Sequence, residues 1–164
     1  HAAARELTRA GRNLQMGSAS DIQGHCTIGD FVRMHRGVHV GQESRLGSFV
    51  WMFPDVLLTN DATPPSDDWR GPVVEDYAVL CARVTLLPGV RIGRHAVVFA
   101  HSLVGIDVPE GKMASGNPAA IRGDASMVRM KDDVRVRAYP WNRRFTRGYP
   151  EEVVLAWREE DAAS

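Results

Sequence analysis

The stretch from Val74 to Gly105 reads VEDYAVLCARVTLLPGVRIGRHAVVFAHSLVG, and it carries an aliphatic residue at every sixth position. The same spacing occurs upstream of residue 60. The full series is Ile22, Ile28, Met34, Val40, Leu46, Met52 and Leu58, then Val74, Leu80, Leu86, Ile92, Val98 and Val104. Neither the 3.6-residue period of an α-helix nor the alternation of a single strand produces this pattern. A solenoid of short strands does, with one flat side for every six residues.

A second series of mostly small or β-branched residues lies two positions before each aliphatic one. It consists of Cys26, Val32, Val38, Ser44, Val50 and Val56, then Ala78, Val84, Val90, Ala96 and Ser102. Three six-residue sides close one triangular coil, so Ile22, Val40 and Leu58 are predicted to stack in one parallel sheet. Glycines that follow the aliphatic position, such as Gly29 and Gly93, are expected at the corners. The pattern predicts an all-β fold, a left-handed parallel β-helix of hexapeptide repeats whose neighbouring coils stabilise one another.

The chain divides into three parts on this pattern. Residues 1–20 are predicted to be a variable N-terminal lead-in, residues 21–123 the β-helix domain, and residues 124–164 a C-terminal extension. In the extension, Pro150 followed by Glu151 and Glu152 predicts the start of a short helix. The arginines before that helix are expected either to meet phosphates or an anionic acceptor, or to form ion pairs over the open end of the solenoid.

Composition narrows the range of partners. Twenty basic and 20 acidic residues cancel, which gives no electrostatic case for a nucleic-acid or membrane partner. No apolar run reaches the length of a membrane span, and no secretory leader is visible, so we expect a cytoplasmic protein. Of the two cysteines, Cys26 occupies an inward position and is predicted to be a core residue rather than a disulfide partner.

An insertion interrupts the repeat at residues 59–73. Leu58 and Val74 are 16 positions apart where a plain repeat needs six, and the added segment is polar and rich in proline. Such a loop leaves a rigid scaffold and is a favoured place for functional residues. The alternative is a passive surface insertion in which Asn60 and Asp61 form an Asx-turn at the start of the loop.

The end of the repeat carries a more specific signal. A Val-Pro-x-Gly turn at residues 108–111 precedes Gly116-Asn117-Pro118-Ala119, and Arg122 follows shortly afterwards. With the coil at residues 86–93, these motifs resemble hexapeptide-repeat acyltransferases over roughly residues 21–123. The resemblance implies a homotrimer with active sites between neighbouring prisms. It also implies acetyl-CoA as a co-substrate, with no tightly bound cofactor.

The loop resembles a narrower group within that family. Thr59-Asn60-Asp61 followed by Pro64 and Ser66 is similar to N-acetyltransferases of nucleotide-linked 3-amino-sugars. The resemblance implies acetyl transfer to the amine of an amino-sugar, in a ternary complex at the subunit interface. The alternatives are an O-acetyltransferase of a sugar or natural product, and a non-catalytic β-helix used for assembly or regulation.

The resemblance also implies positions for coenzyme A. Small side chains at Ala82 and Ala100 let the pantetheine arm approach. His101 stands where the family commonly has glycine, so its imidazole is expected either to narrow the coenzyme groove or to contact the thioester arm; the alternative is an exposed coil histidine. Farther along the groove, the resemblance places Gly116, Asn117, Pro118 and Ala119, with Arg122 near the phosphates.

Four residues are candidates for catalysis. Asn60 is suited to orient the amine or the thioester carbonyl, and ionised Asp61 to attract an ammonium group and accept its proton. His35 and His39 lie one coil before the loop, and each is an alternative base or a solvated coil histidine. The histidines lack the spacing of the metal-binding β-helix family, the γ-class carbonic anhydrases, so we expect no metal site.

Overall fold

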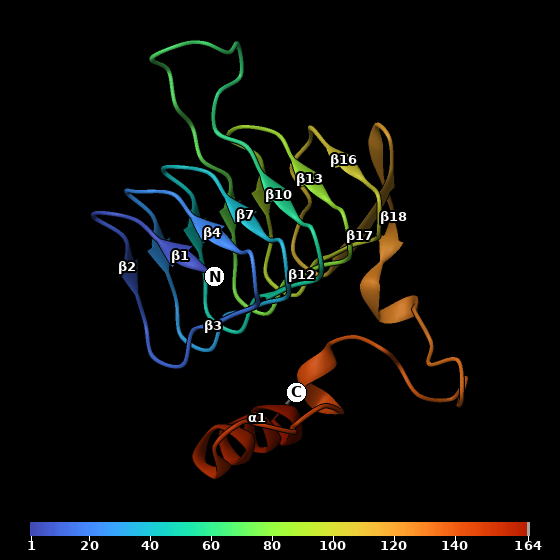
Figure 1. Ribbon diagram of the computed structural model, residues 1–164. Coiled ribbons are helices and arrows are strands. Elements are labelled where there is room, and N and C mark those ends of the chain that lie inside the picture. The colour runs from blue at the N-terminus through green and yellow to red at the C-terminus, as the bar shows by residue number, and fades with distance from the viewer. Residues whose placement is uncertain (164) are drawn as a thin grey trace.

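The computed structural model describes residues 1–163, and those residues form a parallel β-helix of about six turns followed by a short C-terminal helix (Figure 1). Up to Val104 the strands are two residues long and lie on three flat sides, and the last turn ends in two longer strands, Lys112–Gly116 and Ala119–Asp124, that pair antiparallel. The winding is left-handed as predicted. The part of the chain that is described contains no helix long and apolar enough to cross a membrane.

Three sheets make up the sides of the prism. Sheet A contains β1 Ala3–Ala4, β4 Asp21–Ile22, β7 His39–Val40, β10 Leu57–Leu58, β13 Thr85–Leu86 and β16 Leu103–Val104. Sheet B contains β2 Arg9–Ala10, β5 Thr27–Ile28, β8 Arg45–Leu46, β11 Val73–Val74 and β14 Arg91–Ile92. Sheet C contains β3 Gln15–Met16, β6 Arg33–Met34, β9 Trp51–Met52, β12 Val79–Leu80, β15 Val97–Val98, β17 Lys112–Gly116 and β18 Ala119–Asp124. We call the turns between sheets the AB, BC and CA corners.

The aliphatic series forms the core as predicted. Ile22, Val40 and Leu58 are register partners in sheet A, and all three are fully buried. Beyond the insertion, Leu58 pairs with Leu86. Cys26 is buried, in agreement with the core position predicted for it, and both cysteines are free thiols.

The β-helix begins earlier than predicted. Residues 1–20, expected to be a lead-in, contain β1, β2 and β3, which pair with β4, β5 and β6. Their inward positions hold Ala4, Ala10 and Met16, which continue the six-residue period; the two alanines are small and exposed, and Met16 packs against the core. The period was therefore present in the sequence, but two alanines carry little hydrophobic signal.

The glycines that follow the aliphatic positions do not form the corner turns predicted for them, but allow neighbouring coils to approach closely. The left-handed backbone at each corner falls three residues after the aliphatic position, and residues such as His25 and Asp55 adopt a positive φ there. Gly29 sits one residue after Ile28, and a Cβ placed on Gly29 would lie 2.5 Å from the carbonyl carbon of Gly47 on the next coil. Glycine at this position permits close approach of the coils, not the turn itself.

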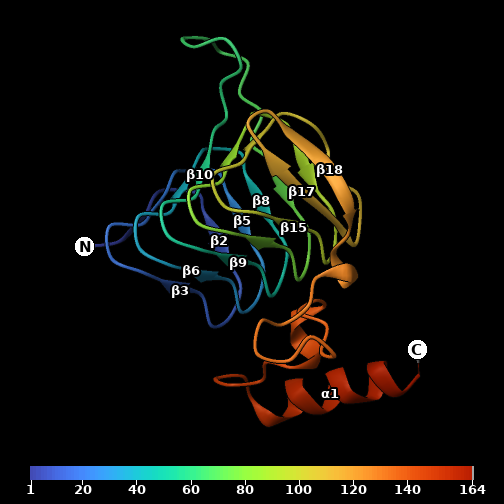
Figure 2. The same cartoon turned by 90° about the vertical axis from the view of Figure 1, so that its right-hand side faces the viewer.

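The C-terminal extension lies along sheet C and not over the open end of the solenoid (Figure 2). After β18 it contains the 3₁₀ helices η1 Ala125–Met127 and η2 Trp141–Arg143 and the helix α1 Glu151–Ala162, which begins after Pro150 as predicted. An aromatic cluster joins the extension to sheet C and the BC corner. Its buried members are Phe31, Tyr77, Val79, Val97, Ala125, Trp141, Tyr149, Val153 and Trp157.

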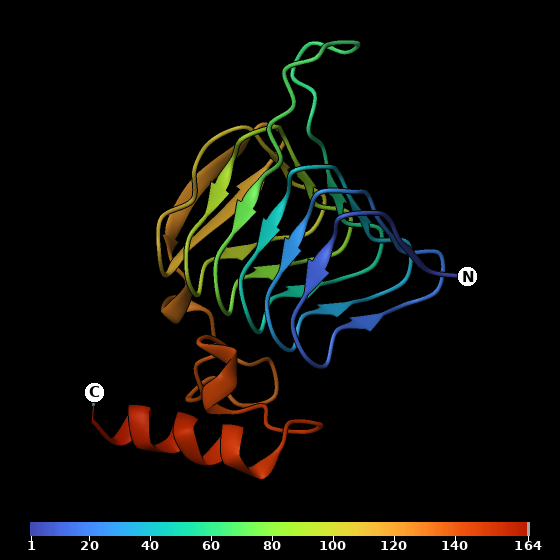
Figure 3. The same cartoon turned by 90° about the vertical axis from the view of Figure 1, so that its left-hand side faces the viewer.

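Arg33 fastens the extension to sheet C. Its guanidinium lies 4.8 Å from the ring centroid of Trp51 and 4.2 Å from that of Tyr149. It also donates a hydrogen bond to the carbonyl of Gly148 at 3.0 Å. The loop at residues 59–72 projects on the opposite side of the prism (Figure 3). Residues 125–163 thus cover sheet C, and among the described residues none of the extension packs on sheet A or sheet B.

Candidate functional site

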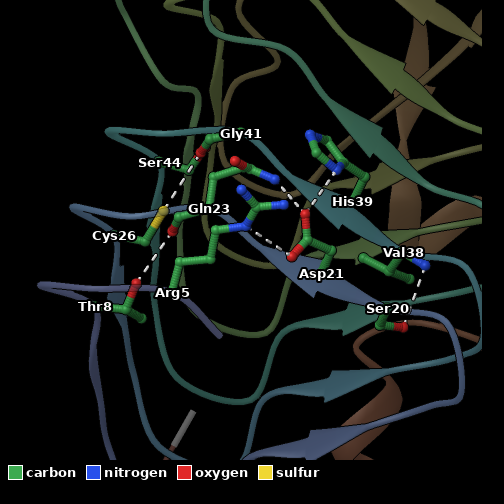
Figure 4. A network of polar contacts seen from close by, with 10 residues as sticks. All are labelled: Arg5, Thr8, Ser20, Asp21, Gln23, Cys26, Val38, His39, Gly41 and Ser44. Carbon is green, nitrogen blue, oxygen red and sulfur yellow. Dashed lines mark hydrogen bonds and ion pairs between the residues drawn. The ribbon is translucent and has the colours of Figure 1, made fainter. Parts of the chain in front are cut away.

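His39 and Asp21 form a pair on the outer face of sheet A (Figure 4). They are register partners on neighbouring strands, β7 and β4, and both occupy the outward position of their strand. His39 Nδ1 lies 3.5 Å from Asp21 Oδ2, and the histidine side chain is 41% exposed. A carboxylate beside Nδ1 favours the imidazole tautomer that carries its proton on Nδ1. The other nitrogen, Nε2, is then free to accept a proton.

Asp21 has further partners that hold its carboxylate in place. Arg5 Nε lies 3.5 Å from Asp21 Oδ1, and the Gln23 side-chain amide donates to Oδ2. Sequence reasoning did not select Asp21. The signal was available, since Asp21 stands 18 positions before His39 and the coil has that period.

His35 does not join this pair. It follows β6 at the edge of sheet C, on the other side of the CA corner from His39. Its ring stacks on Phe53, with centroids 4.7 Å apart and an interplanar angle of 15°. The structure therefore places His35 in an aromatic row and His39 on an open sheet face.

Asn60 and Asp61 begin the inserted loop at the AB corner. Asn60 packs over the preceding coil, because a Cβ placed on Gly41 would meet its Oδ1 at 3.2 Å. Asp61 accepts hydrogen bonds from the Ser66 hydroxyl at 2.7 Å, the Ser66 amide at 2.8 Å and the Thr63 amide at 3.1 Å. These bonds, that of the hydroxyl first, lower the pKa of Asp61. A carboxylate so engaged is a weak proton acceptor, and its visible role is to hold the loop.

Trp69 is the aromatic residue of the loop. Its indole Nε1 donates to the carbonyl of Ser66 at 2.8 Å, and its backbone forms an antiparallel bridge with Asp61. The side chain remains 48% exposed. The loop therefore presents an exposed indole ring that is held by contacts within the loop itself.

Ala82, Ala100 and His101 lie together at the CA corner. The amide of His101 donates to the carbonyl of Ala82 at 3.0 Å, which stacks the two coils directly. Ala100 and His101 are exposed, Ala82 is half-buried, and His101 adopts a φ of +60°. This corner therefore carries small side chains, Ala82 and Ala100, at two successive levels of the solenoid, with the exposed His101 beside them.

The β17–β18 hairpin adjoins this corner. The Gly116 amide donates to the hydroxyl of Ser102, the residue after His101, at 3.2 Å. Gly116 has a φ of +113°, and Asn117 and Pro118 are exposed at the turn, whereas Ala119 is buried. Arg122 turns back onto Ser115, donating to its hydroxyl at 3.2 Å and its carbonyl at 3.3 Å.

The predicted residues thus fall into two groups on opposite edges of sheet A. The coenzyme candidates line the CA corner, and Asn60 and Asp61 lie at the AB corner. Between them the face carries His39 with Leu57, which is 37% exposed. Chemically, this flank offers an oriented histidine beside an edge of small residues on which an extended molecule can lie.

No family model matches the chain, but individual proteins do. Serine acetyltransferase 4 of Arabidopsis thaliana is 34% identical over 146 residues, covering 85% of this chain and 37% of that protein. Galactoside O-acetyltransferase of Lactococcus lactis is 34% identical over 85 residues, covering 47% of this chain and 41% of the relative. The chain therefore spans well under half the length of these relatives.

A solved structure agrees with the sequence matches. Perosamine N-acetyltransferase from Caulobacter crescentus, crystallised with CoA and GDP-perosamine, superposes with a TM-score of 0.65 and 26% identity. The match covers 75% of this chain and 54% of that one. By repeat sequence, closing motif and fold, the chain belongs to the hexapeptide-repeat acetyltransferase family.

Proposed function

We propose that this protein is an acyltransferase that uses acyl-CoA, most simply acetyl-CoA, as donor and a small molecule as acceptor. Family membership supports the reaction class. The observation that carries the proposal is the His39–Asp21 pair, which lies on the flank bordered by the small-residue edge of the CA corner. A solenoid used only for assembly has no need of an oriented histidine there.

The chemistry follows from this arrangement. The thioester arm lies along Ala82, Ala100 and the Gly116 turn, and the acceptor approaches over sheet A. The acceptor oxygen or nitrogen attacks the thioester carbonyl while His39 Nε2 takes its proton, and Asp21 stabilises the imidazolium that forms. The carbon–sulfur bond then breaks, and the proton on His39 passes to the departing thiolate. General base catalysis of this kind contributes about 10²- to 10⁴-fold in rate.

The amine of an amino-sugar, either free or nucleotide-linked, is the first candidate acceptor. The Thr59-Asn60-Asp61 turn supports it, as does the likeness to an enzyme crystallised with GDP-perosamine. In this proposal Asn60 orients the acceptor, and Asp61 fixes the loop that carries Asn60.

A hydroxyl group is the second candidate, and one observation favours it. An alcohol hardly ionises at neutral pH, so it needs a base to remove its proton as it attacks. A neutral amine is nucleophilic without that help. The His39–Asp21 pair supplies such a base. One of the relatives is a galactoside O-acetyltransferase.

We propose that the active assembly is a homotrimer. Sheet C is covered by the chain's own extension, which leaves sheets A and B to meet neighbouring copies. Since the loop and the coenzyme edge flank opposite sides of sheet A, contact between copies brings the loop of one chain toward the coenzyme edge of another.

The test is a direct assay with purified protein. Acetyl-CoA is supplied with a panel of amino-sugars, nucleotide-linked amino-sugars, serine and galactosides, and free CoA thiol is followed together with the product mass. A gain of one acetyl group on an amine or a hydroxyl distinguishes the two acceptor candidates. Absence of CoA binding at millimolar concentration by calorimetry contradicts the proposed function.

A further inference from the structure

A cavity of about 230 Å³ lies between sheet C and the C-terminal extension, away from His39. Its walls are mostly aromatic. The sheet contributes Trp51 and Phe53, and the extension contributes Tyr139, Trp141 and Phe145. Ligand pockets for drug-sized molecules range from about 300 to 1,000 Å³, so this cavity suits a single ring system and not a whole cofactor.

The aromatic walls are held in place by hydrogen bonds to residues outside the cavity and by contacts with one another. Trp51 Nε1 donates to Tyr149 Oη at 3.0 Å, and Trp141 Nε1 donates to the carbonyl of Tyr77 at 3.1 Å. Trp51 meets Phe145 edge-on, with centroids 5.6 Å apart and an interplanar angle of 84°. Both indole N–H groups already have hydrogen-bond acceptors, so the cavity offers a preformed set of rings and neither indole needs a hydrogen bond from a ligand.

One cation completes the lining. Arg144 Nε donates to the carbonyl of Ala138 at 2.8 Å, which fixes the plane of the guanidinium. Among residues 1–163, no carboxylate forms an ion pair with Arg144, whereas Arg143 pairs with Asp161 and Arg135 with Asp133. A rigid aromatic cavity whose lining includes an exposed guanidinium, bonded to one carbonyl but to no carboxylate among residues 1–163, favours a flat ring that carries a negative group.

The cavity adjoins the coenzyme edge. Phe53 directly precedes the CA-corner residues Pro54 and Asp55, and Tyr139 interacts with Cys81, the neighbour of Ala82. Burial also raises the pKa of Tyr139 to about 12, so its hydroxyl stays neutral and remains a hydrogen-bond donor at neutral pH.

We propose that this cavity binds the nucleobase of a nucleotide, with Arg144 against the adjoining phosphate. The inference rests on the proposed function, because both the donor coenzyme A and a nucleotide-linked acceptor carry such a group. Every nucleobase has a flat π-face that can stack on aromatic side chains, and the fork of a guanidinium group matches the oxygens of a phosphate. A longer acyl chain fits the apolar walls but offers no charge for Arg144.

Tryptophan fluorescence tests the proposal, because two of the wall residues are tryptophans. The intact protein is titrated with adenosine 3′,5′-bisphosphate, the nucleotide end of coenzyme A, and separately with UDP, GDP and dTDP. We expect quenching by one of these two classes, and the class that quenches identifies the donor or the acceptor as the source. Absence of quenching by all four at millimolar concentration overturns the proposal.

Two variants localise the site. Arg144→Gln removes the cation and is expected to weaken binding about tenfold or more, as loss of a charge-assisted hydrogen bond does. Val79→Phe projects a ring into the cavity from its wall and is expected to abolish quenching, with thermal unfolding measured to verify the fold. Arg135→Gln, the same charge change at an arginine paired with Asp133, is the matched control and should bind as the unaltered protein does.

Kinetics separate this inference from the proposed function. If acyl transfer occurs, Val79→Phe and Arg144→Gln should raise the KM of one substrate and leave kcat nearly unchanged. Transfer with unaltered KM in both variants overturns the cavity proposal alone. Nucleotide binding that both variants weaken, in a protein without acyl transfer, overturns the proposed function and leaves the cavity assignment standing.

Discussion

Trp157 donates its indole Nε1–H to Tyr77 Oη at 2.9 Å, joining helix α1 to the BC corner of the prism across 80 positions in the sequence. Tyr77 in turn stacks between Phe49 and His95, with centroids 4.8 and 4.7 Å away. The extension is therefore packed onto a ladder of rings that runs along the solenoid.

The first prediction concerns this contact. Trp157→Ala should lower the free energy of unfolding by about 3–5 kcal/mol, because a buried aromatic side chain is removed. Trp157→Phe should cost about 1 kcal/mol through the lost hydrogen bond. Leu155→Ala, on the exposed face of the same helix, is the control and should change stability by about 0.5 kcal/mol or less. Urea unfolding provides the measurement, and equal effects at both positions contradict the packing of α1.

The second prediction compares adjacent leucines in β10. Leu58 is fully buried and Leu57 is 37% exposed on the opposite face. Leu58→Ala should destabilise the protein by about 2–5 kcal/mol, and Leu57→Ala by clearly less. Thermal or chemical denaturation of the two variants measures the difference. A larger loss of stability in Leu57→Ala than in Leu58→Ala is incompatible with the register of sheet A.

The third prediction concerns the proposed base. His39→Ala should lower kcat by about 10²- to 10⁴-fold with a smaller change in the KM for the donor. Asp21→Asn should also lower kcat, because it loses the charge that orients and stabilises the imidazole. His25→Ala, at an exposed corner, is the control and should retain full activity. Undiminished turnover in His39→Ala places the base elsewhere.

The fourth prediction concerns the loop. The pKa of Asp61 is lowered by its hydrogen bonds with Ser66 and Thr63, so the carboxylate stabilises the loop above its unfolded pKa and loses that effect as pH falls through its lower folded value. A ¹⁹F label on Trp69 should therefore report a mobile loop in acid, and Asp61→Asn should show the same mobility at neutral pH. Asp67→Asn, exposed on the same loop, is the control. An unchanged signal in Asp61→Asn removes Asp61 as the anchor.

The fifth prediction concerns His95. Burial, and then the charges of Arg94 and Arg143, lower its pKa from 6.5 to about 4. The unfolded chain therefore takes up a proton below about pH 6.5 while the folded protein does not, so stability falls as pH drops through that interval. His95 retains partial exposure, and we expect a loss of about 1–2 kcal/mol between about pH 7 and pH 5. His95→Gln should flatten this dependence, measured by urea unfolding, while His25→Gln should not.

The fold could be read from the sequence because its core repeats a single rule. Once Ile22 and Val40 occupy equivalent positions, the six-residue period places the inward residues up to Leu58 and, after the insertion, again from Val74 to Val104. The first coil was missed because Ala4 and Ala10 occupy its inward positions, and alanine contributes too little apolar surface to mark a repeat.

The candidate site was less predictable because it depends on side-chain partners. The sequence singled out Asp61 as a proton acceptor, but the hydroxyl of Ser66 and two backbone amides take up its carboxylate. His35 and His39 looked equivalent by spacing, yet one stacks on Phe53 and the other meets Asp21. The cavity beneath Tyr139 and Arg144 was not predictable either, since the extension follows no period that would show where it docks.

The pairing of Leu58 with Leu86 has a consequence for how such proteins diversify. The two residues are 28 positions apart, ten more than one coil, yet they sit in the same register as Val40 and Leu58. The inserted loop leaves the prism at the AB corner and returns to it without changing the register of the buried residues. Loops of other lengths and recognition chemistries can be exchanged at that exit, and the scaffold need not be redesigned to accept them.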